Sequence, residues 1–212
     1  MPKIQAATTN PGKLAELSHG SRLWSTPGEE LEEWLIEALP GLAALPPCAE
    51  DGNSFAANAH QKAMHYSRFV KGLVLADDSG LEVAALGGEP GIHSARYAGP
   101  AATDEQNNAK LLRAMNEVPP PMRTARFVCE LALAREGKFL ARFTGVAEGY
   151  ILGEPRGGGG FGYDPLFLDP MTGKTFAELS LEEKLRRSHR GKAVRGLMEW
   201  LATGPRSLDW SE

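Results

Sequence analysis

The chain has 212 residues and a formal net charge of -4 at pH 7. A chain of this length suits one sizeable domain or two closely packed lobes, and it can bury a core without disulfides. The net charge argues against duplex nucleic acid as the main partner, although a small polyanion held by a few cations is compatible with it. No segment approaches the roughly 20 apolar residues of a membrane span, and the start of the chain lacks the apolar region of a signal peptide. We therefore expect a soluble, cytoplasmic protein that binds neither nucleic acid nor a membrane.

The two cysteines, Cys48 and Cys129, do not lie in a Cys-x-x-Cys pair. A zinc site built on thiolates is therefore not expected. Two cysteines also do not make a disulfide framework, which fits a reducing compartment.

Helices and strands are mixed along the chain, as judged from apolar periodicity, capping residues and Gly/Pro breaks. In order, we expect a strand over 3–8, a helix beginning at 13–17, an acidic helix over 29–39 and a helix over 54–70. A buried strand over 73–76 then leads into residues 77–80, and a loop over 87–100 and a helix over 104–118 capped by Thr103 follow. The rest of the chain is expected to contain a hairpin of strands 123–135 and 138–150, a glycine loop over 157–163, a short strand near Phe167, a helix opening at Ser180 and a last helix over 191–203. This order predicts an α/β chain with a mixed sheet.

The segment Thr8 to Lys13 lies where the first strand passes into the first helix. Backbone N–H groups at a helix N-terminus favour anions, and a lysine one turn into the helix adds a full charge. The segment is a candidate cradle for a triphosphate, although it lacks the glycine pattern of a P-loop. On spacing alone, an ordinary capped helix start explains it equally well.

Asp77 and Asp78 follow directly after the apolar run that ends at Ala76. Two adjacent carboxylates at the end of a buried strand repel each other and resist desolvation, and a divalent cation would relieve both effects. Carboxylate oxygens suit Mg²⁺, and one carboxylate could also take a proton from an attacking water. The alternative is an acidic turn in solvent, which the buried run before it disfavours.

The glycine-rich loop from Gly157 to Pro165 is not a dinucleotide-binding fingerprint, because Pro165 excludes the helix that must follow the last glycine. Glycines beside Phe161 would let a flat ligand approach the backbone and the ring. A flexible hairpin loop explains the segment as well.

Lys184 and the segment Ser188 to Lys192 supply Arg, Lys and His donors that suit carbonyl oxygens or phosphates. A solvated basic helix end is the alternative.

The motifs together, in this order, resemble the inosine triphosphate pyrophosphatase family of non-standard purine nucleotide pyrophosphatases. The resemblance runs from about residue 4 to 200. Its motifs are Thr9–Lys13, Ala76–Val83, Leu86–Gly91, Ser94–Gly99, Gly160–Pro165 and Ser188–Ala193.

The resemblance implies an elongated mixed β-sheet with flanking helices that form two lobes around a central cleft. Residues 1–212 would form a single two-lobed nucleotide pyrophosphatase domain with a core of about 4–200 and a C-terminal tail over 204–212. The activity it implies is the Mg²⁺-dependent hydrolysis of ITP, dITP and XTP to the monophosphate and pyrophosphate, which cleanses the nucleotide pool. It also implies a homodimer.

The family's functional residues transfer to matching positions of this chain. Asp78 would be the general base and a Mg²⁺ ligand, with Asp77 and Glu50 as the other metal ligands. The substrate would be bound by Thr8, Thr9, Asn10, Lys13, Ser79, Phe161, Gly162, Tyr163, Asp164, Lys184, His189 and Arg190.

Three features depart from the family pattern. Thr9 replaces the more usual Gly or Ser, and Ala56 and Ala57 replace acidic residues before Asn58. The segment over 23–46 is longer than is typical. Two other functions are weighed against the main one: a pyrophosphatase for modified pyrimidine nucleotides, which His189, Arg190 and the Phe161 loop disfavour, and a non-catalytic nucleotide sensor, which the Asp77–Asp78 pair disfavours.

Overall fold

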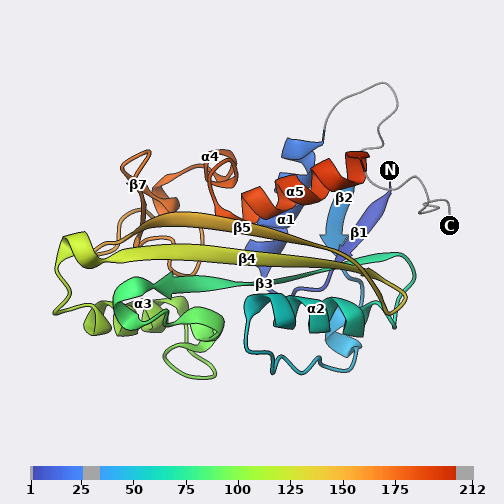
Figure 1. The fold of residues 1–212 in the computed structure, drawn as a ribbon, viewed down its shortest axis with the longest axis horizontal. Helices are drawn as coiled ribbons and strands as arrows, with labels where there is room; N and C mark the ends of the chain where they lie inside the picture. Colours follow the sequence, from blue (N-terminus) through green and yellow to red (C-terminus); the bar gives the residue numbers. More distant parts are fainter. Residues whose placement is uncertain (1, 26–33, 204–212) are drawn as a thin grey trace. The chain divides into compact units, whose positions relative to one another are not determined.

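A computed structural model describes residues 2–25 and 34–203 of the chain (Figure 1). Within these residues, seven strands form one sheet in the order β2-β1-β3-β4-β5-β6-β7. The strands are β1 (Lys3–Ala6), β2 (Leu35–Ala38), β3 (Leu73–Val83), β4 (Thr124–Arg135), β5 (Lys138–Ile151), β6 (Phe167–Asp169) and β7 (Lys174–Thr175). The α-helices are α1 (Pro11–Trp24), α2 (Phe55–Tyr66), α3 (Asp104–Ala114), α4 (Leu181–Leu185) and α5 (His189–Thr203).

The sheet is mixed, as predicted. β1 pairs in parallel with β2 and with β3, whereas β6 pairs in antiparallel with β5 and with β7. β4 and β5 are joined by Glu136 and Gly137, which both have positive φ angles. Two such residues make the tight turn whose twist matches that of a hairpin. The α/β class and the predicted hairpin are therefore confirmed.

The chain divides into two compact units. Unit 1 consists of Met1–Asp78, Cys129–Gly145 and Arg190–Glu212, and unit 2 consists of Ser79–Val128 and Val146–His189. The strands β3, β4 and β5 each contribute residues to both units. The predicted cleft stays a prediction.

In unit 1, helices cover both faces of the strands. Successive residues of β3 point to opposite faces, so Leu75 joins a core with α1 and α5, whereas Val74 joins a core with α2. Figure 1 shows α1 and α5 on one side of the strands and α2 on the other. This arrangement places the N-termini of α1 and α5 and one face of α2 beside the middle of β3.

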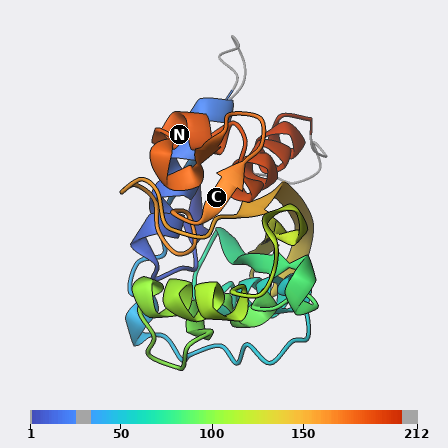
Figure 2. The same cartoon turned by 90° about the vertical axis from the view of Figure 1, so that its left-hand side faces the viewer.

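In unit 2, one apolar core joins the far ends of β3, β4 and β5 to β6 and α3. Leu111 and Met115, from the end of α3, are fully buried in it, together with Leu166 and Phe167. Figure 2 shows α3, the yellow-green helix, and the short orange helix α4 on opposite sides of the unit 2 strands. The core fixes the loop that carries the glycine-rich motif.

Two predicted elements were wrong. The acidic segment predicted as a helix over 29–39 contains the strand Leu35–Ala38, because pairing with β1 buries Ile36 completely; residues 29–33 of that prediction lie outside the described residues. The buried strand predicted over 73–76 was given too early an end, because β3 continues through Asp77 and Asp78 to Val83. Burial of Leu81 and Val83 in unit 2 carries the strand on past the two aspartates.

The helix caps agree with the sequence. Asn10, Ser54, Thr103 and Ser180 all cap the helices that follow them, and the last two form capping boxes. α2 and α3 each end about four residues earlier than predicted, and α5 begins two residues earlier, at His189. No helix among the described residues is long and apolar enough to cross a membrane.

Candidate functional site

The carboxylate of Asp77 lies at the centre of a network of buried charges in unit 1. Its Oδ1 accepts a hydrogen bond from Lys13 Nζ at 2.5 Å, and its Oδ2 accepts one from Arg190 Nε at 2.8 Å. The thiol of Cys129 donates to the same Oδ2 at 3.3 Å. Arg190 also pairs with Glu16, at 2.5 Å, and is itself only 1% exposed. Opposite charges therefore alternate from α1 through β3 to α5.

Asp78, the next residue, has a different environment. It is half-buried on β3, and its Oδ2 accepts a hydrogen bond from the side-chain amide of Asn58 on α2, at 3.1 Å. Asn58 is held in place by Gly52, whose N–H donates to the Asn58 side chain. A side chain at Gly52 would collide with Asn58 and Ala57, so this close approach needs glycine. The loop before α2 therefore fixes the group that orients Asp78.

Lys62 connects the remaining acidic residue to this network. Its Nζ lies 2.8 Å from Glu50 and donates to the backbone carbonyl of Asp77 at 3.2 Å. Burial lowers the pKa of Lys62, but the hydrogen bond and the charge of Glu50, together with the charges of Asp78 and Asp77, outweigh burial and raise the pKa, so the ammonium stays charged. Lys62 stands one helical turn after Asn58, so both side chains lie on the same face of α2. We refer to Lys13, Glu16, Glu50, Lys62, Asp77, Asp78 and Arg190 as the charged cluster.

The two adjacent aspartates have pKa values shifted in opposite directions. Burial raises the pKa of Asp78 to about 6, against the opposing charges of Lys62 and Lys13. Burial would also raise the pKa of Asp77, but Arg190 and Lys13 hold it well below its usual range. Neighbouring carboxyl groups whose pKa values are driven apart take different roles at a site. Asp77 is a permanent anion, and Asp78 is the group able to accept a proton near neutral pH.

The predicted metal ligands do not form a set of three. Among the residues that the structure describes, no group of three or more Asp, Glu, His or Cys side chains is arranged to hold a metal ion. Both oxygens of Asp77 face cations, whereas Asp78 is half-buried and Glu50 is exposed. Mg²⁺ is usually held by one or two carboxylates together with waters and substrate phosphates. Asp78 and Glu50 therefore fit Mg²⁺ as a donor set.

The predicted phosphate segment forms the N-terminus of α1. Asn10 caps the helix by accepting from the N–H of Lys13, and Pro11 occupies its first turn. Thr8 accepts a hydrogen bond from the N–H of Asn10, and both Thr9 and Asn10 are exposed. The segment therefore offers hydroxyl, amide and helix-terminal donors to solvent beside the ammonium of Lys13.

In unit 2, Lys184 and Asp164 form a buried ion pair, each with a side chain only 3% exposed. Asp164 also accepts from the backbone N–H of Phe161 at 2.9 Å. The ammonium of Lys184 lies 5.0 Å from the centre of the Phe161 ring and 5.8 Å from that of Phe176. Gly160 has a positive φ of 69°, and a side chain there would collide with Asp164. This glycine is thus required by the ion pair.

His189 is buried against an aromatic stack. Its ring lies parallel to that of Phe127, with 4.6 Å between centres and 8° between planes. Phe127 in turn contacts Phe167 and Phe176. This packing sets the plane of the imidazole. We refer to Phe127, Phe161, Asp164, Phe167, Phe176, Lys184 and His189 as the aromatic cluster.

Gly162 and Tyr163 serve to anchor the glycine-rich loop. The N–H of Gly162 donates to Asp104 at 2.6 Å, and its carbonyl accepts from Asn108. The buried hydroxyl of Tyr163 donates to the carbonyl of Ser94 at 2.8 Å. Both ends of the Gly162–Tyr163 segment are thereby tied to unit 2.

The structure thus sorts the predicted residues into two groups. Unit 1 contains Thr8, Thr9, Asn10, Lys13, Glu50, Asp77, Asp78 and Arg190, and unit 2 contains Ser79, Phe161, Gly162, Tyr163, Asp164, Lys184 and His189.

Four residues of unit 1 were missed by the sequence analysis: Glu16, Asn58, Lys62 and Cys129. The spacing of Asn58 and Lys62 on one face of α2 was a usable signal. Glu16 and Cys129 gave none, because their partners lie far away in the sequence.

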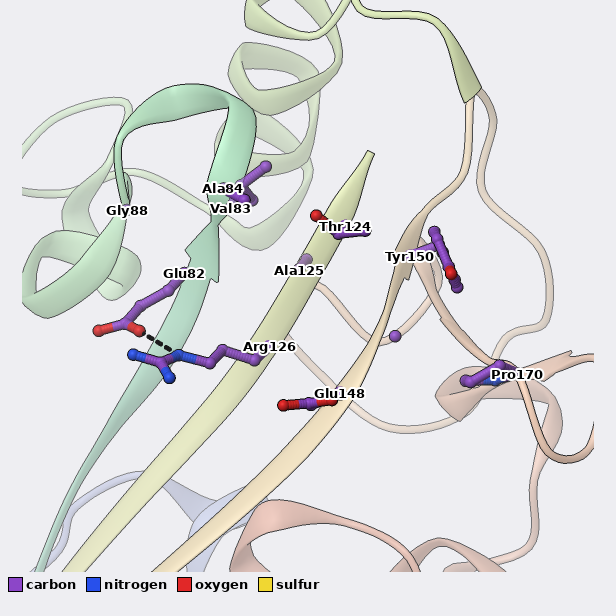
Figure 3. A pocket seen from close by; sticks show the side chains of 11 residues that line it. Glu82, Val83, Ala84, Gly88, Thr124, Ala125, Arg126, Glu148, Tyr150 and Pro170 are labelled. Atoms are coloured by element: carbon purple, nitrogen blue, oxygen red, sulfur yellow. Dashed lines mark hydrogen bonds and ion pairs between the residues drawn. The ribbon is translucent and has the colours of Figure 1, made fainter. Parts of the chain in front are cut away.

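A hollow of about 510 Å³ in unit 2 contains none of the predicted residues. In Figure 3, Glu82 of β3 pairs with Arg126 of β4, and Glu148 and Tyr150 extend from β5. Arg126, Glu148 and Tyr150 are exposed. This mixed-charge face is distinct in composition from both clusters.

The strand order defines an α/β protein, and the start of α1 with its exposed donors lies in the same unit as the two aspartates. The chain belongs to the Ham1 family, which it matches over residues 4–200. That range covers both clusters and every predicted site residue.

Its relatives match over almost their whole length. A dITP/XTP pyrophosphatase of Thermus thermophilus is 48% identical, over 96% of this chain and 93% of the relative. The dITP/XTP pyrophosphatase of Geobacillus kaustophilus is 49% identical, over 94% of each chain. Among solved structures, a HAM1 protein from Coxiella burnetii is 40% identical with a TM-score of 0.81, over 96% of this chain and 100% of that one. The predicted α/β class with a mixed sheet and flanking helices, and the family resemblance, are therefore confirmed.

Proposed function

We propose that this chain hydrolyses non-standard purine nucleoside triphosphates (ITP, dITP and XTP) to the monophosphate and pyrophosphate, and so cleanses the nucleotide pool. Relatives that are 48% and 49% identical over nearly the whole chain are named dITP/XTP pyrophosphatases. The observation that carries the proposal is the contrast between the contacts of the two aspartates: Asp77 is held by Lys13 and Arg190, whereas the half-buried Asp78 accepts a hydrogen bond from Asn58. The pKa shifts agree with this contrast, because the pKa of Asp77 is held well below its usual range and burial raises that of Asp78 to about 6.

Asp78 acts as the general base. It takes a proton from a water whose oxygen forms a bond to the α-phosphorus, while the bond from that phosphorus to the bridging oxygen breaks. Pyrophosphate leaves with the electron pair, and the proton on Asp78 passes to solvent. Asn58, hydrogen-bonded to Oδ2, orients the carboxylate during the transfer. Hydrolysis needs no covalent intermediate with the protein.

The triphosphate is bound by Lys13 and by the donors of Thr8, Thr9 and Asn10 at the start of α1. A helix N-terminus and an ammonium group together favour several phosphate charges. Such preorganised charges supply much of the catalysis in phosphoryl transfer, because they stabilise the charge that develops on the leaving group.

Mg²⁺ is the proposed cofactor, and Asp78 and Glu50 would hold it. When bound, it would neutralise phosphate charge and polarise the phosphorus–oxygen bonds. Glu50 is 40% exposed on its side chain and is paired with Lys62, so it can exchange this partner without being drawn from a buried position. Chelation of divalent cations is expected to abolish turnover, and added Mg²⁺ to restore it.

The base and sugar are bound by four members of the aromatic cluster (Phe161, Asp164, Lys184 and His189) together with Ser79, Gly162 and Tyr163. A purine ring can stack on Phe161, beside the fixed charge of Lys184. Hypoxanthine and xanthine present a carbonyl at position 6, which accepts from donors such as His189. Adenine presents an amino group there, so donor would face donor and buried groups would be left unpaired.

Arg190 receives a different role from the one first predicted. It was expected to read the base, but it pairs with Asp77 and Glu16 and is 1% exposed. We propose that it stabilises the charged cluster and leaves base selection to the aromatic cluster. Both clusters lie within one nucleotide pyrophosphatase domain whose core covers residues 4–200, and turnover requires both.

We also propose a homodimer in the cytoplasm. The exposed face in Figure 3 carries both signs of charge and an exposed tyrosine, which suits a two-fold contact between identical surfaces. Two free cysteines fit a reducing compartment. Sedimentation of the wild type and of Glu148→Arg tests the dimer: the wild type should sediment as a dimer and the variant as a monomer.

The test of the function is kcat/KM for ITP, XTP, ATP, GTP and a modified pyrimidine triphosphate, with Mg²⁺ and with chelator. We expect ITP and XTP to exceed ATP by at least about 10²-fold, since sites of this kind discriminate by up to ~10⁴–10⁵. A preference for the pyrimidine would favour the alternative enzyme, and tight binding of ITP without turnover would favour a nucleotide sensor. Equal values for ITP and ATP would refute the base-selection argument.

A further inference from the structure

Asp77 was predicted to be a metal ligand, but its contacts are those of a group that binds other side chains. Its Oδ1 accepts from Lys13, and its Oδ2 accepts from both Arg190 and Cys129. The side chain has no exposed surface. An ionised carboxylate has about four lone-pair sites in all, and at least three are used by these donors.

A divalent cation at Asp77 would have to enter beside two positive side chains. Lys13 and Arg190 lie 2.5 Å and 2.8 Å from the carboxylate oxygens. At such distances, like charges repel strongly when they are shielded from water. Metal binding at this carboxylate would therefore have to displace a cation already there.

The two cations on Asp77 are not equivalent. Arg190 is buried, and Glu16 holds its far side at 2.5 Å. Lys13 has an 18% exposed side chain and stands in the first turn of α1, beside the exposed donors of the phosphate segment. Asp77 is thus fixed from the buried side by Arg190 and Cys129, and it holds Lys13 on the other side.

We infer that Asp77 is a positioning residue, which aims the ammonium of Lys13 at the phosphate chain of the substrate and does not bind the metal. The inference deepens the proposed function and rests on it. It assigns the two aspartates separate roles. Asp78 accepts the proton of the water and binds the metal, whereas Asp77 positions Lys13, the cation that binds phosphate. The backbone carbonyl of Asp77 holds Lys62 independently of its side chain, because that contact does not involve the carboxylate.

The first test measures Mn²⁺ binding to nucleotide-free protein by electron paramagnetic resonance. It compares the wild type with the double variant Lys13→Met, Asp77→Asn, which removes one positive and one negative charge and so keeps the net charge. Arg190 then remains paired with Glu16, and the buried charges stay balanced. Glu50→Gln serves as the ligand-loss control.

We expect the double variant to lose less than about tenfold in Mn²⁺ affinity, whereas Glu50→Gln loses tenfold or more, as expected for the loss of a ligand. A loss of tenfold or more in the double variant would make Asp77 a metal ligand and overturn the inference.

The second test is a double-mutant cycle in kcat/KM for ITP. If Asp77 acts through Lys13, Asp77→Asn should reduce kcat/KM by about 10–100-fold in the wild type, because misplacing a catalytic group costs up to about 10². In the Lys13→Met background, the same change should cost less than about threefold. A cost of threefold or more in that background would show that Asp77 acts independently of Lys13, as a purely structural carboxylate would.

Asp77→Asn alone leaves Lys13 and Arg190 without their shared anion, and this single variant can fail to fold. In that case, two measurements still decide the inference: the comparison of Mn²⁺ affinities, and the ratio of kcat/KM for ITP between Lys13→Met and the double variant. Arg190 stays paired with an acidic residue in both of these variants. The proposed function fails separately: a wild type that releases no pyrophosphate from ITP refutes the activity, while the Mn²⁺ result still assigns Asp77.

Discussion

The charged cluster of unit 1 and the aromatic cluster of unit 2 both bury ionised side chains, but they stabilise them in different ways. In unit 1, Asp77 and Arg190 each contact two groups of opposite charge: Asp77 contacts Lys13 and Arg190, and Arg190 contacts Asp77 and Glu16. In unit 2, Lys184 and Asp164 form a pair that is covered by the rings of Phe161 and Phe176.

This difference matches two chemical tasks. A network of charges with some exposed members can accept a polyanion and a cation, because Lys13 and Glu50 can change partners while their neighbours remain paired. An ion pair beneath aromatic rings presents flat apolar surface with a fixed donor nearby, which suits a neutral heterocycle. We therefore expect substitutions in the charged cluster of unit 1 to affect the chemical step, and substitutions in the aromatic cluster of unit 2 to affect the choice of base.

The largest expected effect is that of Asp78→Asn. Asparagine is nearly isosteric but can neither accept the proton nor offer a charged ligand, so kcat should fall by more than the ~10²–10⁴ typical of the loss of a general base. Thermal unfolding should stay close to that of the wild type. Glu82→Gln, on the same strand and paired with Arg126, is the matched control and should keep its activity. An Asp78→Asn enzyme with more than about a tenth of wild-type activity would remove Asp78 from the mechanism.

A smaller effect is expected from Gly160→Ala. The new side chain would collide with Asp164 and break the pair with Lys184, at a cost of about 3–5 kcal/mol in unfolding free energy. Gly162→Ala is the control, because Gly162 also has a positive φ but has open space around it. It should lose only the roughly 1–2 kcal/mol of backbone strain. The free energy of unfolding of both variants is measured by denaturant titration. Equal losses of this free energy in Gly160→Ala and Gly162→Ala would contradict the role given to the ion pair.

The smallest effect is expected from Phe127→Leu, which removes the ring stacked on His189. Such stacking is worth about 0.5–1.5 kcal/mol, so the preference for ITP over ATP should fall by about two- to tenfold. Phe167→Leu is the control, since Phe167 lies in the same core with ring contacts to Phe127 and Phe176. The readout is the ratio of kcat/KM values. If both variants change this ratio equally, Phe127 supports the core and not the base-reading histidine.

Local signals predicted much of this molecule. The caps at Thr103 and Ser180, the hairpin turn at Glu136–Gly137 and the apolar run before Asp77 all act within a few residues, so a single segment reveals them. The family motifs then contained part of each cluster, including Lys13, Asp77, Asp78 and Arg190 in unit 1 and Phe161, Asp164 and His189 in unit 2.

Long-range partners could not be predicted. The strand at Leu35–Ala38 exists because β1 lies beside it, and acidic residues upstream suggested a helix instead. Likewise, nothing near Asp77 in the sequence indicates that Arg190, 113 residues away, would neutralise it. The contacts from which we infer a positioning role for Asp77 could not be predicted for the same reason, because its partners are supplied by three distant segments.

The most direct test of the account is hydrolysis of ITP by the wild type in water enriched in ¹⁸O, in the absence of any inorganic pyrophosphatase, followed by ³¹P NMR of the products. Asp78 is proposed to direct water to the α-phosphorus. The account therefore predicts ¹⁸O in inosine monophosphate and unlabelled pyrophosphate as the only other product. Label in pyrophosphate, or orthophosphate formed without a pyrophosphate intermediate, would show that water attacks another phosphorus and would contradict it.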